Sequence, residues 1–180
     1  MKTQNSLVLS VALVCLALGA CAASESHRST GQVIDDTTIA TRTKTALLAD
    51  STTDGLNIDV EVDRDKVQLN GFVDSKDQVK RAGEIARAVP GVTSVENNLQ
   101  VSDGTRRTGE YIDDTALSTS VKTALMGDAL APASEIDVEV NRGVVSLGGY
   151  VDSKEERNAA VAAAKGVKGV QKVIDNMAVR

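Results

Sequence analysis

The apolar positions of the chain change their spacing in a fixed order, and the same order occurs twice. Residues 117–125 carry apolar side chains at i, i+4, i+7 and i+8, the spacing of one helix face. Residues 136–140 and 145–151 alternate between apolar and polar side chains, as the two strands of a hairpin do. A second helical pattern follows Ser153, which we expect to cap that helix as Ser75 does in the other copy, and a last alternating segment ends at Val179. The pattern therefore predicts the order helix, strand, strand, helix, strand.

The same order appears earlier in the chain because the sequence is a tandem repeat. The segment that starts at Asp35 recurs at Asp113 with an offset of 78 residues, and 30 of 67 aligned positions are identical without a gap. This predicts domains at residues 35–101 and 113–179, joined by a polar linker at 102–112. We expect each domain to be an αββαβ unit of the α+β class, with a three-stranded sheet and two helices packed on one of its faces.

Acidic pairs stand where the first helix of each repeat is predicted to begin. These are Asp35 with Asp36, and Asp113 with Asp114. Neighbouring residues at a helix start do not converge on one substrate atom, so we interpret the pairs as helix caps rather than as catalytic carboxylates.

Further carboxylates alternate with the apolar residues of the first strand, beginning with Asp59 and Glu61. They occupy the strand face opposite the core. We expect this face to be open to solvent or to a partner, and we favour solvent. The run lacks the glycine and the bidentate glutamate of a calcium-binding loop, so we predict no metal site here.

The composition of the chain argues against several kinds of binding and catalysis. The chain has 20 Lys+Arg against 25 Asp+Glu, a net charge of −5, one His and no Trp. An acidic, aromatic-poor chain is unsuited to nonspecific nucleic-acid binding, which needs a basic face and stacking platforms. Few of the residues used for proton transfer or transition-metal binding are present, so we predict no catalytic residue and no cofactor.

The first residues have the pattern of an export signal. Lys2 precedes an apolar run from Leu7 to Leu18 that is too short to span a bilayer. The sequence Leu18-Gly19-Ala20-Cys21 resembles the lipobox of bacterial lipoproteins. This resemblance implies a signal peptide at 1–20 and a Cys21 that carries diacylglycerol and palmitate; the alternative is a plain secretory signal and a free thiol.

Residues 21–34 would then form the lipidated cysteine and a flexible tether. In the lipoprotein pattern an Asp after the cysteine marks retention in the inner membrane, and this chain has Ala22 there. We therefore expect an outer-membrane lipoprotein that faces the periplasm.

Two basic stripes are candidate contacts for anionic lipid headgroups. The first lies on the predicted first helix of the second repeat, and the second surrounds its second helix. They consist of Ser118, Lys122 and Met126, and of Lys165, Lys168 and Lys172. The alternative for both is an ordinary solvated helix face.

Phe72 and Tyr150 occupy equivalent positions in the two repeats, on the strand face opposite the core. We favour a role in covering a sheet edge or in packing the two domains together. The alternative is a contact site for lipid or for another protein.

These features together resemble the BON domain, named for bacterial osmotically inducible and nodulation proteins. The resemblance rests on the Asp-Asp-Thr helix start, on Val-Lys-Thr-Ala-Leu at 121–125, on the Val-x-Leu-x-Gly-x-Val strand and on the closing Gly-Val-x-x-Val-x-x-Asn-x-x-Val at 91–101 and 169–179.

A lipobox followed by two such domains is similar to the dual-BON outer-membrane lipoproteins and the osmotically inducible periplasmic proteins. The resemblance implies a non-enzymatic protein that binds membrane phospholipids and supports envelope integrity under osmotic stress. The alternative function is a periplasmic adaptor that binds another envelope protein through its sheet faces or through Phe72 and Tyr150.

Overall fold

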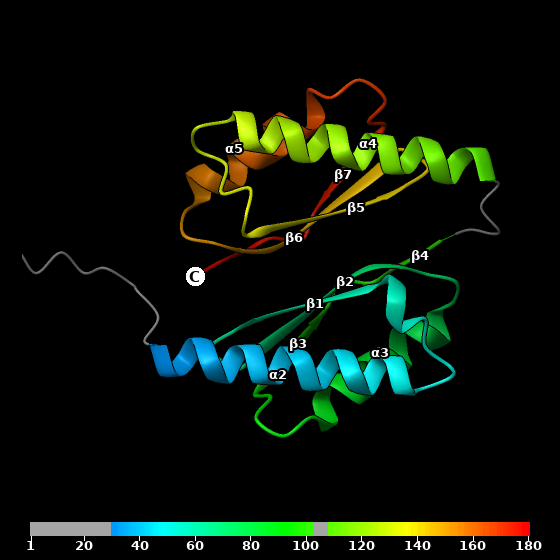
Figure 1. The fold of residues 1–180 in the computed structure, drawn as a ribbon, viewed down its shortest axis with the longest axis vertical. Coiled ribbons are helices and arrows are strands. Elements are labelled where there is room, and N and C mark those ends of the chain that lie inside the picture. The colour runs from blue at the N-terminus through cyan, green and yellow to red at the C-terminus, as the bar shows by residue number, and fades with distance from the viewer. Residues whose placement is uncertain (1–29, 103–107) are drawn as a thin grey trace, which may run out of the picture.

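The computed structural model describes the backbone of residues 30–102 and 108–180, and the side chains of residues 35–102 and 113–180. In these parts of the chain the two repeats form two domains whose sheets face each other (Figure 1). The helices of each domain cover the outer face of its sheet, so that the molecule has four layers in the order helices, sheet, sheet, helices (Figure 1).

Both domains have the same element order. The first consists of α2 (Thr30–Ala49), a short 3-10 helix η1 (Gly55–Asn57), β1 (Ile58–Asp63), β2 (Lys66–Val73), α3 (Lys76–Ala88), β3 (Ser94–Asn97) and β4 (Gln100–Val101). The second consists of α4 (Thr108–Gly127), β5 (Ile136–Asn141), β6 (Val144–Val151), α5 (Lys154–Lys165), β7 (Lys172–Asp175) and β8 (Ala178–Val179).

The sheet of each domain is built around its second strand. In the first domain β2 pairs antiparallel with β1 on one side and parallel with β3 and β4 on the other. The last strand is split into two short pieces, which pair with β2 on either side of Gly71. The second domain repeats this topology, so the predicted αββαβ fold of the α+β class is confirmed.

Gly71 and Gly149 stand in the central strands at positions where no other residue type fits. Both have positive φ, of 123° and 109°. A Cβ added at either position would lie 2.2 Å from a backbone oxygen, that of Asn57 or Glu135. The close neighbour is therefore the chain that enters the first strand, and only glycine fits there.

The apolar cores lie between each sheet and its own helices, as the alternation of apolar and polar residues along the strands predicts. The buried residues of the first core are Ile39, Leu47, Ile58, Val62, Val67, Leu69, Val73, Ala82, Ala86 and Leu99. Those of the second are Val121, Leu125, Ile136, Val138, Val140, Val145, Leu147, Val151, Ala160, Ala164 and Met177. Thr43 is also fully buried, and its hydroxyl donates to the Ile39 carbonyl at 2.8 Å, which satisfies its polar atom.

The first helix of each domain begins earlier than predicted. Helix α2 starts at Thr30, inside the stretch expected to be a tether, and α4 starts at Thr108, inside the stretch expected to be a linker. The acidic pairs that we interpreted as caps therefore lie within the helices, and the capping prediction is wrong. The second helices do begin as predicted, because Ser75 and Ser153 accept from the backbone N–H of Gln78 and Glu156.

Asp36 and Asp114 hold the hairpin turns instead. The Asp36 carboxylate accepts the backbone N–H of Arg64 at 3.2 Å and of Asp65 at 3.0 Å. Both turn residues have positive φ, which is unfavourable for residues other than glycine. The Asp114 carboxylate accepts from the turn of the second domain in the same way. One buried carboxylate in each domain thus ties the first helix to the hairpin.

Replacing Asp36 by alanine should therefore destabilise the first domain. The change removes two hydrogen bonds to a charged acceptor and leaves a strained turn unsupported, so we expect a loss of about 2 to 3 kcal/mol in the free energy of unfolding, measured by urea denaturation. Asp35→Ala is the matched control: Asp35 is exposed, and we expect a change within about 0.5 kcal/mol. Equal losses in both variants would contradict this role.

Candidate functional site

The polar faces of the two sheets meet at the centre of the molecule, and Gln68 of β2 is the residue around which they pack. Its side chain is fully buried. Its Oε1 accepts the backbone N–H of Gly149 at 2.7 Å, and its Nε2 donates to the Asn176 carbonyl at 2.8 Å. These two bonds reach from the first domain into the second and fix the orientation of the amide.

Next to Gln68 the two repeats meet at equivalent positions, Asn70 and Gly148. Asn70 is 1% exposed and donates from Nδ2 to Gln68 Oε1 at 2.9 Å. A Cβ added at Gly148 would lie 2.2 Å from the Asn70 Nδ2. The large side chain of one repeat therefore fills the space left by the missing side chain of the other, which makes the two faces complementary.

The structure places the two aromatic residues differently. Tyr150 is buried between the domains, where its hydroxyl donates to the Lys66 carbonyl of β2 at 3.1 Å, and burial raises its pKa. Phe72 is half-buried and has no hydroxyl to make the equivalent bond.

Arg180 adds an ion pair between the domains. Its guanidinium is only 9% exposed and lies 3.3 Å from an Asp63 oxygen at the end of β1. It also contacts Glu135 at 2.7 Å and Asp152 at 2.8 Å within its own domain. A cation between three carboxylates offsets their mutual repulsion at this edge of the interface.

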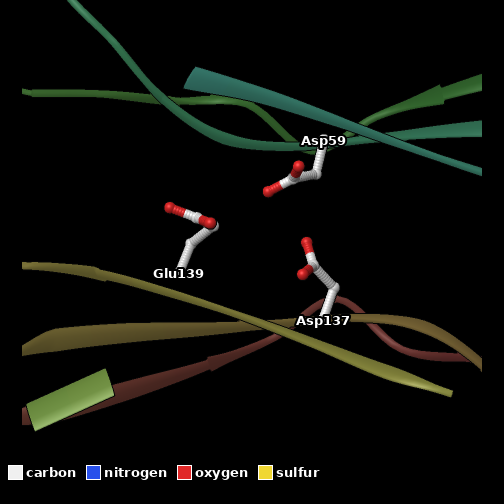
Figure 2. A group of neighbouring side chains, drawn as sticks. All are labelled: Asp59, Asp137 and Glu139. Atoms are coloured by element: carbon white, nitrogen blue, oxygen red, sulfur yellow. The ribbon is translucent and has the colours of Figure 1, made fainter. Parts of the chain in front are cut away.

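Carboxylates of the two edge strands meet at the same interface, so the prediction of a solvated strand face is wrong. Asp59 of β1 points towards Asp137 and Glu139 of β5 (Figure 2). One oxygen from each of the three lies within 4.8 Å of the others. The strand sequence Ile-Asp-Val-Glu-Val is identical in the two repeats, so like charges meet when the faces pack together.

This arrangement shifts the titration of the two β5 carboxyls. Burial, followed by the proximity of Asp59, raises the pKa of Asp137 to about 7 and the pKa of Glu139 to about 8. Lys122 of α4 opposes both shifts through its positive charge. Three carboxylate oxygens suit a hard cation such as Ca²⁺, but they fall short of the 6 to 8 oxygens that this ion usually takes.

The first predicted lipid-binding stripe runs along α4 beside the edge strand β5. Ser118 is half-buried, and its hydroxyl donates to the Val138 carbonyl at 3.4 Å, so it does not belong to an exposed face as predicted. Lys122 is exposed, close enough to the acidic cluster to act on it. Met126 lies at the end of the helix and is 69% exposed.

The second stripe lies elsewhere. Lys165, Lys168 and Lys172 are all exposed, and Lys168 lines a groove of about 470 Å³ together with Asp113 and Asp114. These aspartates lie 13 and 12 residues before Met126 on α4. At 1.5 Å of rise per residue that is roughly 20 Å along the helix, so the groove that Lys168 lines lies far from Met126. Cys21 lies outside the described residues.

Exposed large apolar side chains mark the end of the first helix in each domain. Met126 is joined by Leu130, which is 62% exposed, in the loop after α4. Leu48 and Leu56 are exposed at the corresponding end of α2 and in the segment that follows it. The two ends lie on opposite sides of the molecule (Figure 1). The sequence prediction missed Leu130, because a single leucine in a loop gives no periodic signal.

No helix in the described parts of the chain is both long enough and apolar enough to cross a bilayer.

Comparison with known proteins identifies the family. The BON-domain family model matches residues 35–103 and, separately, residues 113–180. The chain belongs to the BON-domain family, and it carries two copies of the domain. The resemblance in the sequence motifs is thereby confirmed.

Named relatives share most of their length with this chain. It is 35% identical to osmotically-inducible protein Y of Escherichia coli, over 84% of this chain and 76% of the relative. It is 31% identical to the outer membrane lipoprotein DolP of Haemophilus influenzae, over 82% and 76%. It is 30% identical to a 21 kDa hemolysin of Actinobacillus pleuropneumoniae, over 82% and 75%.

The packing of Asn70 against Gly148 predicts that Gly148→Ala weakens the interface. The new methyl group would collide with a buried amide, so we expect a loss of about 1 to 3 kcal/mol in the free energy of unfolding, measured by urea denaturation. Asn70→Gly in the same chain should recover part of this loss, because it removes the collision. Gly127→Ala is the control, since nothing lies within 4 Å of its added Cβ. If Gly148→Ala cost no more free energy of unfolding than Gly127→Ala, the proposed complementarity would be refuted.

Proposed function

We propose that this protein is a non-enzymatic component of the bacterial envelope that contacts phospholipid surfaces through the end of α4. Membership of the BON family and the names of two relatives, an osmotically inducible protein and an outer membrane lipoprotein, support a role in the envelope under osmotic stress. The observation that carries the lipid-binding proposal is the exposure of Met126 and Leu130 at the end of α4, where the exposed cation Lys122 lies one turn before Met126.

The physical argument is that of a small interfacial anchor. Large apolar side chains that stay exposed on a small domain favour removal from water, at about 25 cal/mol per Å² of apolar surface buried. A lysine near an anionic membrane adds about 1 kcal/mol. These contributions are modest, so the domain would bind reversibly and would rely on an anchor to stay at the membrane.

The proposed anchor is diacylglycerol on Cys21, with an outer-membrane location facing the periplasm. Several acyl chains hold a protein far more firmly than one, at about 0.8 kcal/mol per buried methylene. The α2 helix begins at Thr30, so the segment between Cys21 and the first domain is short. Such a tether keeps the domains close to the membrane and raises the effective concentration of a weak lipid-binding surface.

The adaptor alternative loses most of its basis. It relied on exposed sheet faces and on the two aromatic residues as docking sites. The polar sheet faces pack against each other, and Tyr150 is buried between the domains.

Vesicle flotation tests the lipid-binding surface, using the chain from residue 22 onwards so that no acyl group contributes. Met126→Asp with Leu130→Asp should weaken binding to phosphatidylglycerol-containing vesicles by about tenfold or more, because two apolar side chains are replaced by anions. Lys122→Glu with Met126→Asp should also weaken it, but Lys122 additionally acts on the acidic cluster, so the first pair is the cleaner test.

The matched control is Leu48→Asp with Leu56→Asp, at the equivalent end of the first domain. This pair should leave flotation close to that of the parent, because Lys44, the equivalent of Lys122, is half-buried and donates to the Ile58 carbonyl instead of facing the headgroups. Undiminished flotation of the Met126 and Leu130 variant would exclude this surface, and equal loss in both pairs would show that binding is not specific to the second domain.

Metabolic labelling tests the anchor. The full-length protein should incorporate radioactive palmitate and sediment with the membrane fraction, and Cys21→Ala should do neither, because it lacks the thiol that accepts diacylglycerol. A Cys21→Ala protein that stays membrane-bound, together with an unlabelled parent, would refute lipidation.

A further inference from the structure

Asp59, Asp137 and Glu139 form an acidic cluster between the two sheets, and the proposed envelope function does not involve this cluster. Asp59 comes from one domain, and Asp137 and Glu139 come from the other, so these carboxylates are close only while the domains are packed together (Figure 2). If all three were charged, their repulsion would act directly against the packing of the sheets.

The surroundings offer little to neutralise them. Glu61 of β1 adds a fourth carboxylate that acts on Asp137. Lys122 of α4 is the cation that acts on both Asp137 and Glu139, and it is exposed to solvent. Lys44 of α2, its equivalent in the first repeat, donates its ammonium group to the Ile58 carbonyl.

The two central strands contribute only neutral side chains at the matching positions. β2 places Gln68 and Asn70 opposite Glu61 and Asp59, and β6 places Ser146 and Gly148 opposite Glu139 and Asp137. The amide donors of Gln68 and Asn70 have the partners described above. One Asp137 oxygen is buried without any hydrogen-bond partner in the structure.

We propose that the two BON domains form a proton-dependent latch, in which Asp59, Asp137 and Glu139 hold the sheets together while they share protons and push them apart once those protons leave. A shared proton converts the repulsion between two buried carboxylates into a hydrogen bond. The latch controls how often the interface opens, and this proposal does not depend on lipid binding.

The direction of the pH effect follows from linkage. In the packed state the pKa of Asp137 is about 7 and that of Glu139 is about 8, above the ordinary range of these carboxyls when the domains are apart. The packed state therefore binds more protons, so its advantage is complete below the ordinary pKa of these carboxyls and is lost progressively as the pH rises from there to about 8. Packing should weaken as the pH rises towards about 8 and should change little above it.

Other contacts also hold the two sheets together. The bonds of Gln68 and the ion pair of Arg180 with Asp63 remain, so the open state would be a minority state even at alkaline pH. The test must therefore detect rare opening.

Amide hydrogen exchange followed by NMR gives such a test on the two-domain protein. The Gly149 N–H donates to Gln68 across the interface, so its protection factor reports interface opening. Asn98 and Asn176 are internal references, because their N–H groups donate within their own domains, to Leu69 and Leu147. Protection factors are corrected for the intrinsic pH dependence of exchange, and EDTA is present so that no divalent cation replaces the protons.

We expect the protection of Gly149 to fall by about tenfold or more between pH 6 and pH 8.5, relative to the two references. The variant Asp59→Asn, Asp137→Asn, Glu139→Gln should lose this pH dependence, because amides do not titrate. The control variant replaces three exposed acids outside the cluster and should behave like the parent; its changes are Asp35→Asn, Asp113→Asn and Glu155→Gln.

Two results would overturn the proposal. One is a parent protein whose Gly149 protection, relative to the references, does not change with pH. The other is a triple cluster variant that keeps the pH dependence of the parent. Glu139→Gln alone serves if the triple variant does not fold: it removes one titrating group, so a shallower dependence supports the latch and an unchanged one refutes it.

Discussion

The structure depends on packing two polar sheet faces against each other. Each domain buries its apolar face under its own helices, and the second face of each sheet finds its partner in the other repeat (Figure 1). Polar groups buried in this way need hydrogen-bond partners. Gln68 meets this need by bonding to main-chain groups of the second domain, which are available wherever the backbone can approach closely. Gly148 permits that approach.

Duplication of the domain explains both the fit and the conflict at this interface. Where the repeats have diverged, as at Asn70 and Gly148, the two faces have become complementary. Where they have stayed identical, as in the Ile-Asp-Val-Glu-Val strands, like charges are brought together. Arg180 offsets the charges of Asp63, Glu135 and Asp152, and Lys122 acts on Asp137 and Glu139. The interface therefore combines a well-fitted centre with an acidic region whose free energy depends on protonation.

This arrangement also separates the surfaces by role. The sheets are used for contact between the domains, and the outward helices remain available to the environment. The end of α4 carries exposed apolar residues, while Lys168 lines a groove at the start of α4, so different outer surfaces can serve different contacts. A lipid anchor at Cys21 would hold the first domain near the membrane through a short segment.

The sequence by itself determined the two repeats, the αββαβ order, the core residues and the Ser75 and Ser153 caps. These follow from periodicity and local hydrogen bonding, which depend on residues near one another in the chain. It could not determine what Asp36 does, because the turn that this carboxylate holds lies 28 and 29 residues away.

The tertiary structure alone decided that the Asp59 face packs against Asp137 and Glu139, and that Ser118 turns towards β5. The alternation of residues along a strand shows which of them share a face, but it does not show which part of the protein covers that face. The contact between the domains joins residues about one repeat apart, such as Gln68 and Gly149. Only the folded arrangement of both sheets therefore shows that the acidic residues form one cluster.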